Sequence, residues 1–184
     1  MDERELIHRL IEKDEPAFKW LVETYRSKVY NTVLNILYDE ADADDSAQEV
    51  FIQVYESISS FKQQSSLSTW IYRIAVRKAL DKLRKRKTRQ QLRKILPWWM
   101  PEENKSSATF YHPGVAIENK QKAAVLFKAI DALPEKQKTA LTLIKIQGMN
   151  YEEASAVMQQ SIKAIESLIS RAKQNLQKQL QKQD

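Results

Sequence analysis

The chain has 184 residues with two glycines, five prolines and no cysteine, and its formal net charge is +6. A composition rich in Ala, Leu, Lys, Gln and Glu favours helices over strands, so we expect an all-α protein. The lack of cysteine excludes disulfides, thiolate metal sites and thiol nucleophiles, and two distant histidines offer little for a zinc site or a catalytic dyad.

The net charge conceals a strong asymmetry along the chain. Residues 1–56 carry six bases and fourteen acids, whereas residues 57–94 carry twelve bases and one acid. Adjacent blocks of opposite charge indicate two different partners, one basic and one polyanionic. The charged first residues show no signal peptide, and no apolar run approaches the length of a membrane span, so we expect a cytoplasmic protein.

Apolar side chains spaced by three and four predict helices from the start of the chain. The first helix covers residues 2–13. Asp14 can cap the next helix, with Pro16 in its first turn. A third helix begins in the acidic run over residues 39–45, because carboxylates favour the positive end of a helix.

A polar loop over residues 62–66 leads into a fourth helix, which we expect to end near Lys87. Hydroxyls and aromatic rings occupy its start, and eleven Lys or Arg against a single acid follow over residues 73–94. So many bases would repel one another without a polyanion nearby. Rings at one end of a helix and cations along its length suit a separated nucleic-acid strand.

Residues 88–116 break the helical pattern with three prolines and a glycine, and this composition predicts a flexible linker. Within it, the segment Leu96-Pro-Trp-Trp-Met-Pro101 is unusually apolar. Two interpretations remain open. We favour a strap packed against a flanking bundle over a docking element for a partner.

The helical period resumes at Ile117 and predicts a second helical domain. One helix runs to about Ala132, Pro134 begins the next, and Gly148 ends it.

The last part of the chain holds two capping signals. Asn150 with Glu153 three residues later forms a capping-box pattern at the start of a short helix, and Ser161 can cap a longer one. A short helix, a tight turn and a longer helix predict a helix–turn–helix unit, although an ordinary helical hairpin has the same pattern.

Acidic side chains gather at the start of the third helix. They are Asp39, Glu40, Asp42, Asp44, Asp45 and Glu49. Helix capping explains the first few of them. A metal-dependent nuclease would also use clustered carboxylates, but these point outward along one helix and no second carboxylate set converges on them. Metal binding therefore ranks last among the interpretations.

Four groups of motifs follow one another along the chain. They are Asp14-Glu-Pro-Ala-Phe18 with Tyr25; Ala43-Asp-Asp45 with Gln48-Glu-Val-Phe51; Phe61, Ser68-Thr-Trp-Ile-Tyr-Arg-Ile74, Ala79-Leu-Asp81 and Arg84; and Leu133-Pro-Glu135, Gly148, Tyr151-Glu-Glu153, Ser167, Arg171-Ala172 and Leu176. In this order and spacing they resemble the extracytoplasmic-function sigma factors of the sigma-70 family, which are small promoter-specificity subunits of bacterial RNA polymerase.

The resemblance implies two small helical domains with separate roles. Residues 1–87 would form region 2, a four-helix bundle that binds core RNA polymerase and opens the −10 element. Residues 88–116 would be the linker, and residues 117–184 would form region 4, a helix–turn–helix that reads the −35 element. The protein would act by binding and not by catalysis, with no cofactor, metal or small-molecule substrate. The resemblance also implies an anti-sigma factor, membrane-anchored or not, that holds the protein inactive.

The same resemblance assigns three sets of site residues and no catalytic residue. Core polymerase would contact Asp44, Asp45, Gln48, Glu49 and Phe51 on the acidic helix. The −10 element would contact Ser65, Ser66, Ser68, Thr69, Trp70, Tyr72, Arg73, Arg77, Lys78, Lys82, Arg84 and Lys85. The −35 element would contact Lys163, Ala164, Ser167, Ser170, Arg171 and Lys173. Flipped bases would be read in the loop over residues 62–69, with Trp70 or Tyr72 as a wedge.

Some positions depart from the family pattern. Arg77 stands where Asn is frequent, and Glu166 and Leu168 stand where many members have basic residues. Gln159 replaces a frequent Gly, and a left-handed conformation there would cost about 1 kcal/mol. A stand-alone helix–turn–helix regulator is the alternative from another class, but it would need a dimer and no clear coiled-coil heptad supports one.

Overall fold

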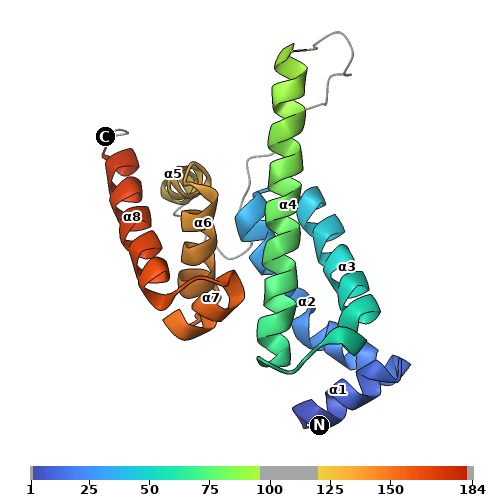
Figure 1. Cartoon of the computed structure of the whole chain (residues 1–184). Helices are drawn as coiled ribbons and strands as arrows, with labels where there is room; N and C mark the ends of the chain where they lie inside the picture. Colours follow the sequence, from blue (N-terminus) through green and yellow to red (C-terminus); the bar gives the residue numbers. More distant parts are fainter. Residues whose placement is uncertain (1, 96–119, 182–184) are drawn as a thin grey trace.

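A computed structural model of the chain describes residues 2–95 and 120–181, with only the backbone described over residues 120–123. The described residues form helices and short connections without a strand, which confirms the predicted all-α class. Two groups of helices, one on each side of the chain's middle, make up the fold (Figure 1). The apolar segment at residues 96–101 and the rest of the predicted linker as far as residue 116 lie outside the described residues.

The first domain is a bundle of four α-helices and one short 3₁₀ turn. Its elements are α1 (Glu3–Ile11), α2 (Glu15–Leu37), α3 (Glu40–Ser57), η1 (Ile58–Ser60) and α4 (Leu67–Ile95). Two predicted caps set where helices begin. An Asp14 oxygen accepts from the backbone N–H of Ala17, and an Asp39 oxygen accepts from that of Asp42, each at 2.9 Å. Fully buried Leu21, Val50 and Ile71 from α2, α3 and α4 fill the core.

Helix α4 continues eight residues past Lys87, so residues 88–95 are helical and do not belong to an extended linker. No Gly or Pro interrupts the sequence from Leu67 to Ile95, and Lys, Arg, Gln and Leu are good helix formers. The guanidinium of Arg86 also donates to Asp39 at 3.0 Å, which ties this part of α4 to the start of α3. The structure thus differs from the expectation that the fourth helix ends near Lys87 and that the linker begins at residue 88.

The second domain contains the predicted helix–turn–helix. Its elements are α5 (Lys120–Asp131), α6 (Glu135–Leu141), the π-helical turn η3 (Thr142–Ile146), α7 (Tyr151–Met158) and α8 (Ile162–Leu180). Asn150 and Glu153 cap each other through two backbone–side-chain hydrogen bonds of 2.8 Å. The Ser161 hydroxyl accepts from the backbone N–H of Ala164 at 3.2 Å. Both predicted caps are therefore confirmed.

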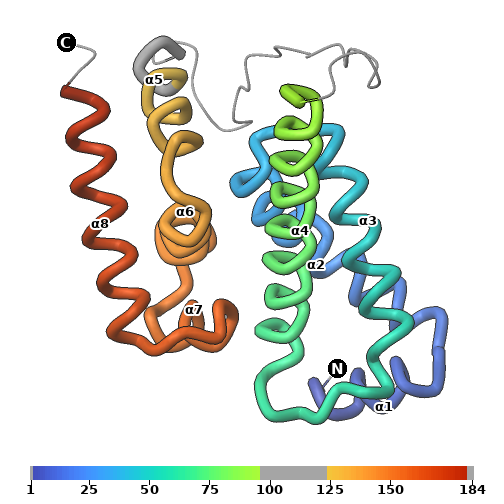
Figure 2. The backbone as a smooth tube through the Cα atoms, turned by 45° about the horizontal axis from the view of Figure 1, so that its top comes forward, coloured from blue at the N-terminus to red at the C-terminus, as the bar shows by residue number. Residues whose placement is uncertain are grey.

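The two domains lie side by side. Helices α6 and η3 pack against α2, and α7 packs against α4. Figures 1 and 2 show the second domain alongside α4, with α7 close to it and α8 on the far side. This arrangement covers one side of α4 and leaves α8 facing away from the first domain.

Candidate nucleic-acid interface

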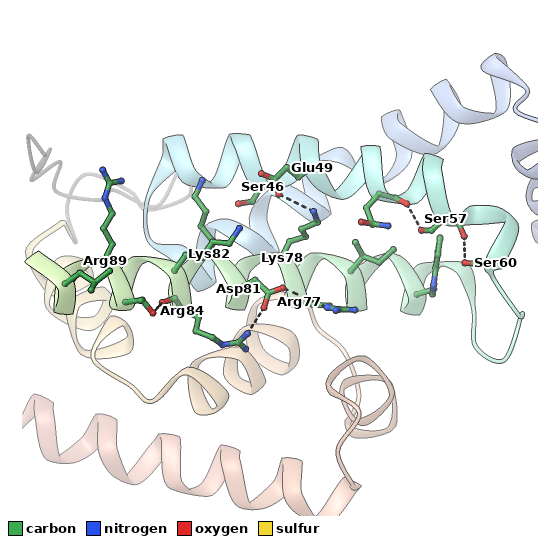
Figure 3. Close-up of a pocket in the computed structure, with 16 residues that line it drawn as sticks. Ser46, Glu49, Ser57, Ser60, Arg77, Lys78, Asp81, Lys82, Arg84 and Arg89 are labelled. Atoms are coloured by element: carbon green, nitrogen blue, oxygen red, sulfur yellow. Dashed lines mark hydrogen bonds and ion pairs between the residues drawn. The ribbon is translucent and has the colours of Figure 1, made fainter. Parts of the chain in front are cut away.

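Helices α3 and α4 enclose a groove of about 910 Å³, and six of its sixteen lining residues are cations. The basic side chains along it are Arg77, Lys78, Lys82, Arg84, Lys85 and Arg89, and Trp70 with Ile74 adds an apolar end. Figure 3 shows Lys78, Lys82 and Arg89 extending from α4 toward α3, whereas Arg77 and Arg84 lie on the side of the second domain. A long basic groove with an aromatic ring at one end fits a single nucleic-acid strand.

Two lysines of this groove pair with acids of α3. The Lys78 ammonium lies 3.2 Å from Glu49, and that of Lys82 lies 3.1 Å from Asp42 and 3.8 Å from Asp45. Burial disfavours the charged form of Lys82, but the hydrogen bond and charge of Asp42, with the charges of Asp45 and Glu49, together outweigh it and raise the pKa. The expected DNA-binding and polymerase-binding sets therefore meet in one groove, which the sequence did not reveal.

The outer face of α3 carries most of the expected polymerase-binding set. Asp44, Gln48 and Glu49 are exposed, but Phe51 is only 8 % exposed and packs in the core. Phe51 thus supports the helix from inside. Ile52 is 57 % exposed and follows Gln48 by one helical turn, so it belongs to the same outer face. Sequence reasoning missed it, although the helical period alone places it there.

The loop before α4 and its first turn are organised by hydroxyls. The Ser66 hydroxyl accepts from the backbone N–H of Thr69 at 3.2 Å and shares further hydrogen bonds with the hydroxyls of Ser68 at 3.0 Å and Thr69 at 2.9 Å. Ser66 therefore caps α4, and Ser65 beside it is half-buried. This cap fixes the start of the helix on which the aromatic side chains stand.

Of the two aromatic candidates, only Trp70 has an accessible ring. The Trp70 ring is half-buried and lies against Phe61, with centroids 5.0 Å apart and planes inclined by 32°. Tyr72 is 8 % exposed and belongs to the core, where burial raises the pKa of its phenol. A base can stack on Trp70, whereas the ring of Tyr72 stabilises the bundle.

The side of α4 that faces the second domain carries arginines. Arg73 donates from Nη2 to the backbone carbonyl of Ala156 in α7 at 2.9 Å. Asp81, the single acid of α4, accepts from Arg84 at 2.8 Å and lies 4.0 Å from Arg77. Arg73 is thus engaged by the protein itself, while Arg77 and Arg84 remain exposed and share one weak counter-charge.

The predicted −35 residues lie along α8. Lys163, Ser170, Arg171 and Lys173 are exposed, and Ala164 and Ser167 are half-buried. Three other side chains hold the helix in the core: Ile165, Ile169 and Ala172, each at most 2 % exposed. No ion pair joins the three cations to any residue in the described part of the chain. This face is ready for contact with a polyanion.

The turn before α8 contains one residue with a left-handed backbone conformation. Gln159 ends α7 in the left-handed region, with φ 53° and ψ 44°. Glycine is the ordinary residue there. Gln159 therefore bears a conformational cost while positioning α8.

Within residues 2–95 and 120–181, no three His, Asp or Glu side chains form a group that could hold a metal ion. None of the helices described is long and apolar enough to cross a membrane.

Two family models match the two domains in order. Residues 21–89 match the model described as Sigma-70 region 2, and residues 123–176 match the model described as Sigma-70, region 4.

Curated relatives align over nearly the whole chain. It is 31% identical to the RNA polymerase sigma-H factor of Pseudomonas aeruginosa, over 97% of this chain and 94% of that one. It is 32% identical to the ECF RNA polymerase sigma-E factor of Haemophilus influenzae, over 98% and 96%. For the sigma-E factor of Escherichia coli K12 the identity is 30%, over 96% and 93%.

Solved structures share the fold. CnrH in complex with the cytosolic domain of CnrY aligns with a TM-score of 0.69 and 21% identity, over 99% of both chains. The sigma factor RpoE from Bartonella quintana, in complex with the anti-sigma factor NepR, aligns with a TM-score of 0.67 and 23% identity, over 89% of this chain and 96% of that one.

Proposed function

The chain belongs to the extracytoplasmic-function group of the sigma-70 family of RNA polymerase sigma factors, and from this we propose how its surfaces divide the work of initiation. As a sigma factor it directs RNA polymerase in transcription initiation. One observation above all supports this assignment of roles to surfaces: the basic groove has Trp70 at one end and an acidic outer face beside it. The first domain would act as region 2 and the second as region 4, and the protein would work in the cytoplasm, by binding alone.

The outer face of α3 would bind a basic surface of core polymerase. Asp44, Asp45, Gln48 and Glu49 supply charge and hydrogen-bonding groups, and exposed Ile52 supplies an apolar contact. Complementary charge would speed the encounter and fix its register. Phe51 would act indirectly, because it anchors the helix in the core.

The groove between α3 and α4 would hold the −10 element as a single strand. Phosphates would contact the cations along α4, and an unstacked base would lie against Trp70. Sequence would be read by bases flipped into the loop over residues 62–69. Holding the strand open requires only that it bind more tightly than the duplex, so no catalytic group is needed.

Helix α8 would enter the major groove of the −35 element. Lys163, Arg171 and Lys173 would contact phosphates, while Ala164, Ser167 and Ser170 would face base edges. Phosphate contacts position the helix and make its affinity depend on salt.

An anti-sigma factor is the remaining partner that we propose. The Bartonella quintana relative of this fold is solved in complex with the anti-sigma factor NepR. Such a partner would act by covering the surfaces that polymerase and DNA need.

The test is transcription in vitro with purified core polymerase and this chain, on fragments of the genome from which it comes. Addition of the chain should start transcripts at positions that core alone does not use. A chain that neither binds core nor directs initiation from any fragment would contradict the proposal. A stand-alone regulator would instead bind duplex DNA in the absence of core.

A further inference from the structure

The end of α2 makes an unusual contact with the second domain. Tyr38 follows Leu37 in the left-handed region, with φ 53° and ψ 38°. Its ring lies 6.4 Å from the ring of Phe127 in α5, between centroids, and the Lys138 ammonium of α6 lies 5.0 Å from its centroid. The end of one helix in the first domain therefore meets two side chains of the second.

The backbone of Tyr38 indicates that this contact is built into the fold. Helices commonly end in this conformation with Gly or Asn, and a bulky residue there is an outlier. Such strain persists where the surroundings hold it, and it gathers at sites with a role. Burial, and then the charge of Asp131, raise the pKa of the Tyr38 phenol, which agrees with a ring enclosed between the domains.

Lys138 is the second part of the contact. Its side chain is 5 % exposed, yet its partner Asp131, at 2.6 Å, is 55 % exposed. The ammonium also lies 3.4 Å from the backbone carbonyl of Ile36, at the negative end of α2. If the domains part, Lys138 keeps Asp131 and gains water, so the contact can open without leaving a buried charge unpaired.

A third contact lies on α4. Arg73 donates to the carbonyl of Ala156, while its Nε is buried with no hydrogen-bond partner among the described residues. The hydrogen-bond donors of its guanidinium are thus only partly paired. A phosphate offers more acceptors than one carbonyl, so Arg73 would gain hydrogen bonds by exchanging Ala156 for a phosphate when α7 moves away.

We propose that Tyr38 and Lys138 form a latch that holds the second domain against the first in the free protein and so withholds Arg73 from DNA. Opening of the latch then precedes engagement of the −10 strand. The DNA part of this proposal rests on the function proposed above, whereas the latch itself does not.

The latch is tested by a distance measured in the full chain, which has no native cysteine. Spin labels at Arg26→Cys in α2 and Lys178→Cys in α8, both exposed positions, report the separation of the domains. The parent should give one narrow, short distance distribution. Tyr38→Gly and Lys138→Met should each broaden it and shift it to longer distances.

Two controls separate the latch from general damage. Tyr38→Phe keeps the ring and should keep the short distance, and Lys145→Met removes an exposed lysine from η3 and should change nothing. Tyr38→Gly relieves the backbone but also removes a partly buried ring, so thermal unfolding is measured for every variant to confirm that the domains remain folded. Unchanged distances in both latch variants, or a broad distribution in the parent, would overturn the latch.

The second measurement is the affinity of the same variants for a fluorescein-labelled oligothymidine strand. If only a minor fraction of the free chain is open, the latch variants should bind about tenfold more tightly. Open variants that bind the strand no better than the parent would overturn the withholding of Arg73 but not the latch. Failure of transcription in vitro with an intact latch would instead overturn the proposed function.

Discussion

Helices α4 and α8 both present cations suited to nucleic acid, but the protein treats the two sets in opposite ways. On α4, Arg73, Lys78 and Lys82 are engaged by a carbonyl or by acids of the same chain. On α8, Lys163 and Lys173 are exposed and pair with no residue that the structure describes. In the proposed function, the face of α8 would be preformed for duplex DNA, whereas α4 would have to exchange internal partners for phosphates.

The internal pairs of α4 are weak enough for such an exchange. Lys78 and Lys82 are each 30% exposed and their acids are partly in water, and pairs of this kind contribute about 0–1 kcal/mol. Phosphate contacts bring in addition the release of counterions from DNA. Polymerase that engages Asp45 and Glu49 would also loosen their hold on the lysines, so the two binding events would support each other.

The largest effect should come from reversal of the charges on α3. Asp45→Lys with Glu49→Lys should weaken binding to core polymerase by about a hundredfold, because like charges then face each other. Lys78 loses its partner and Lys82 keeps only Asp42, so both should at the same time bind an oligothymidine strand more tightly. Fluorescence anisotropy with labelled protein and with labelled strand measures the two affinities.

The matched control reverses two exposed acids away from α3, Glu12→Lys with Glu23→Lys. It should leave core binding near that of the parent. Equal loss of core and strand binding in the α3 variant would point to misfolding and would remove the evidence for coupled surfaces.

A smaller effect should follow from replacing one lysine on each of the two helices. Lys173→Gln on α8 removes a cation that pairs with none of the described residues, so binding to −35 duplex should weaken about tenfold. The slope of log affinity against log salt concentration should fall by about one. Lys78→Gln on α4 also removes the pair with Glu49, so strand binding should weaken by only about threefold. Titrations at several salt concentrations measure both. Equal losses would show that internal pairing on α4 does not compete with DNA.

Local features of the fold could be predicted from the sequence, but contacts between helices could not. The caps at Asp14 and Asn150 depend on residues three positions away, and both are present. The end of α4 lies eight residues beyond the predicted Lys87, because the prolines and glycine that predict the linker begin only at Pro97 and no helix breaker precedes them in α4.

The contacts made by the residues of the candidate site could likewise be predicted only in part. Exposed lysines on α8 follow from helical period alone, whereas the pairing of Lys82 with Asp42 depends on how α3 packs on α4. Contacts of Arg73 and Tyr38 depend further on how two domains meet. Sequence reasoning thus placed the charges on their helices but could not tell which were already engaged.

The smallest effect should come from the turn that positions α8. Gln159 adopts φ 53°, so Gln159→Gly removes an unfavourable left-handed side chain and should stabilise the second domain by about 1 kcal/mol. The gain should appear as a midpoint of thermal unfolding raised by a few degrees. Gly also makes the unfolded chain more flexible, which offsets part of the gain. Affinity for −35 duplex should stay unchanged if α8 is already preformed, because the substitution alters neither its cations nor its direction. A rise in affinity would show instead that strain at Gln159 holds α8 away from its binding position, and the contrast between α8 and α4 would then narrow.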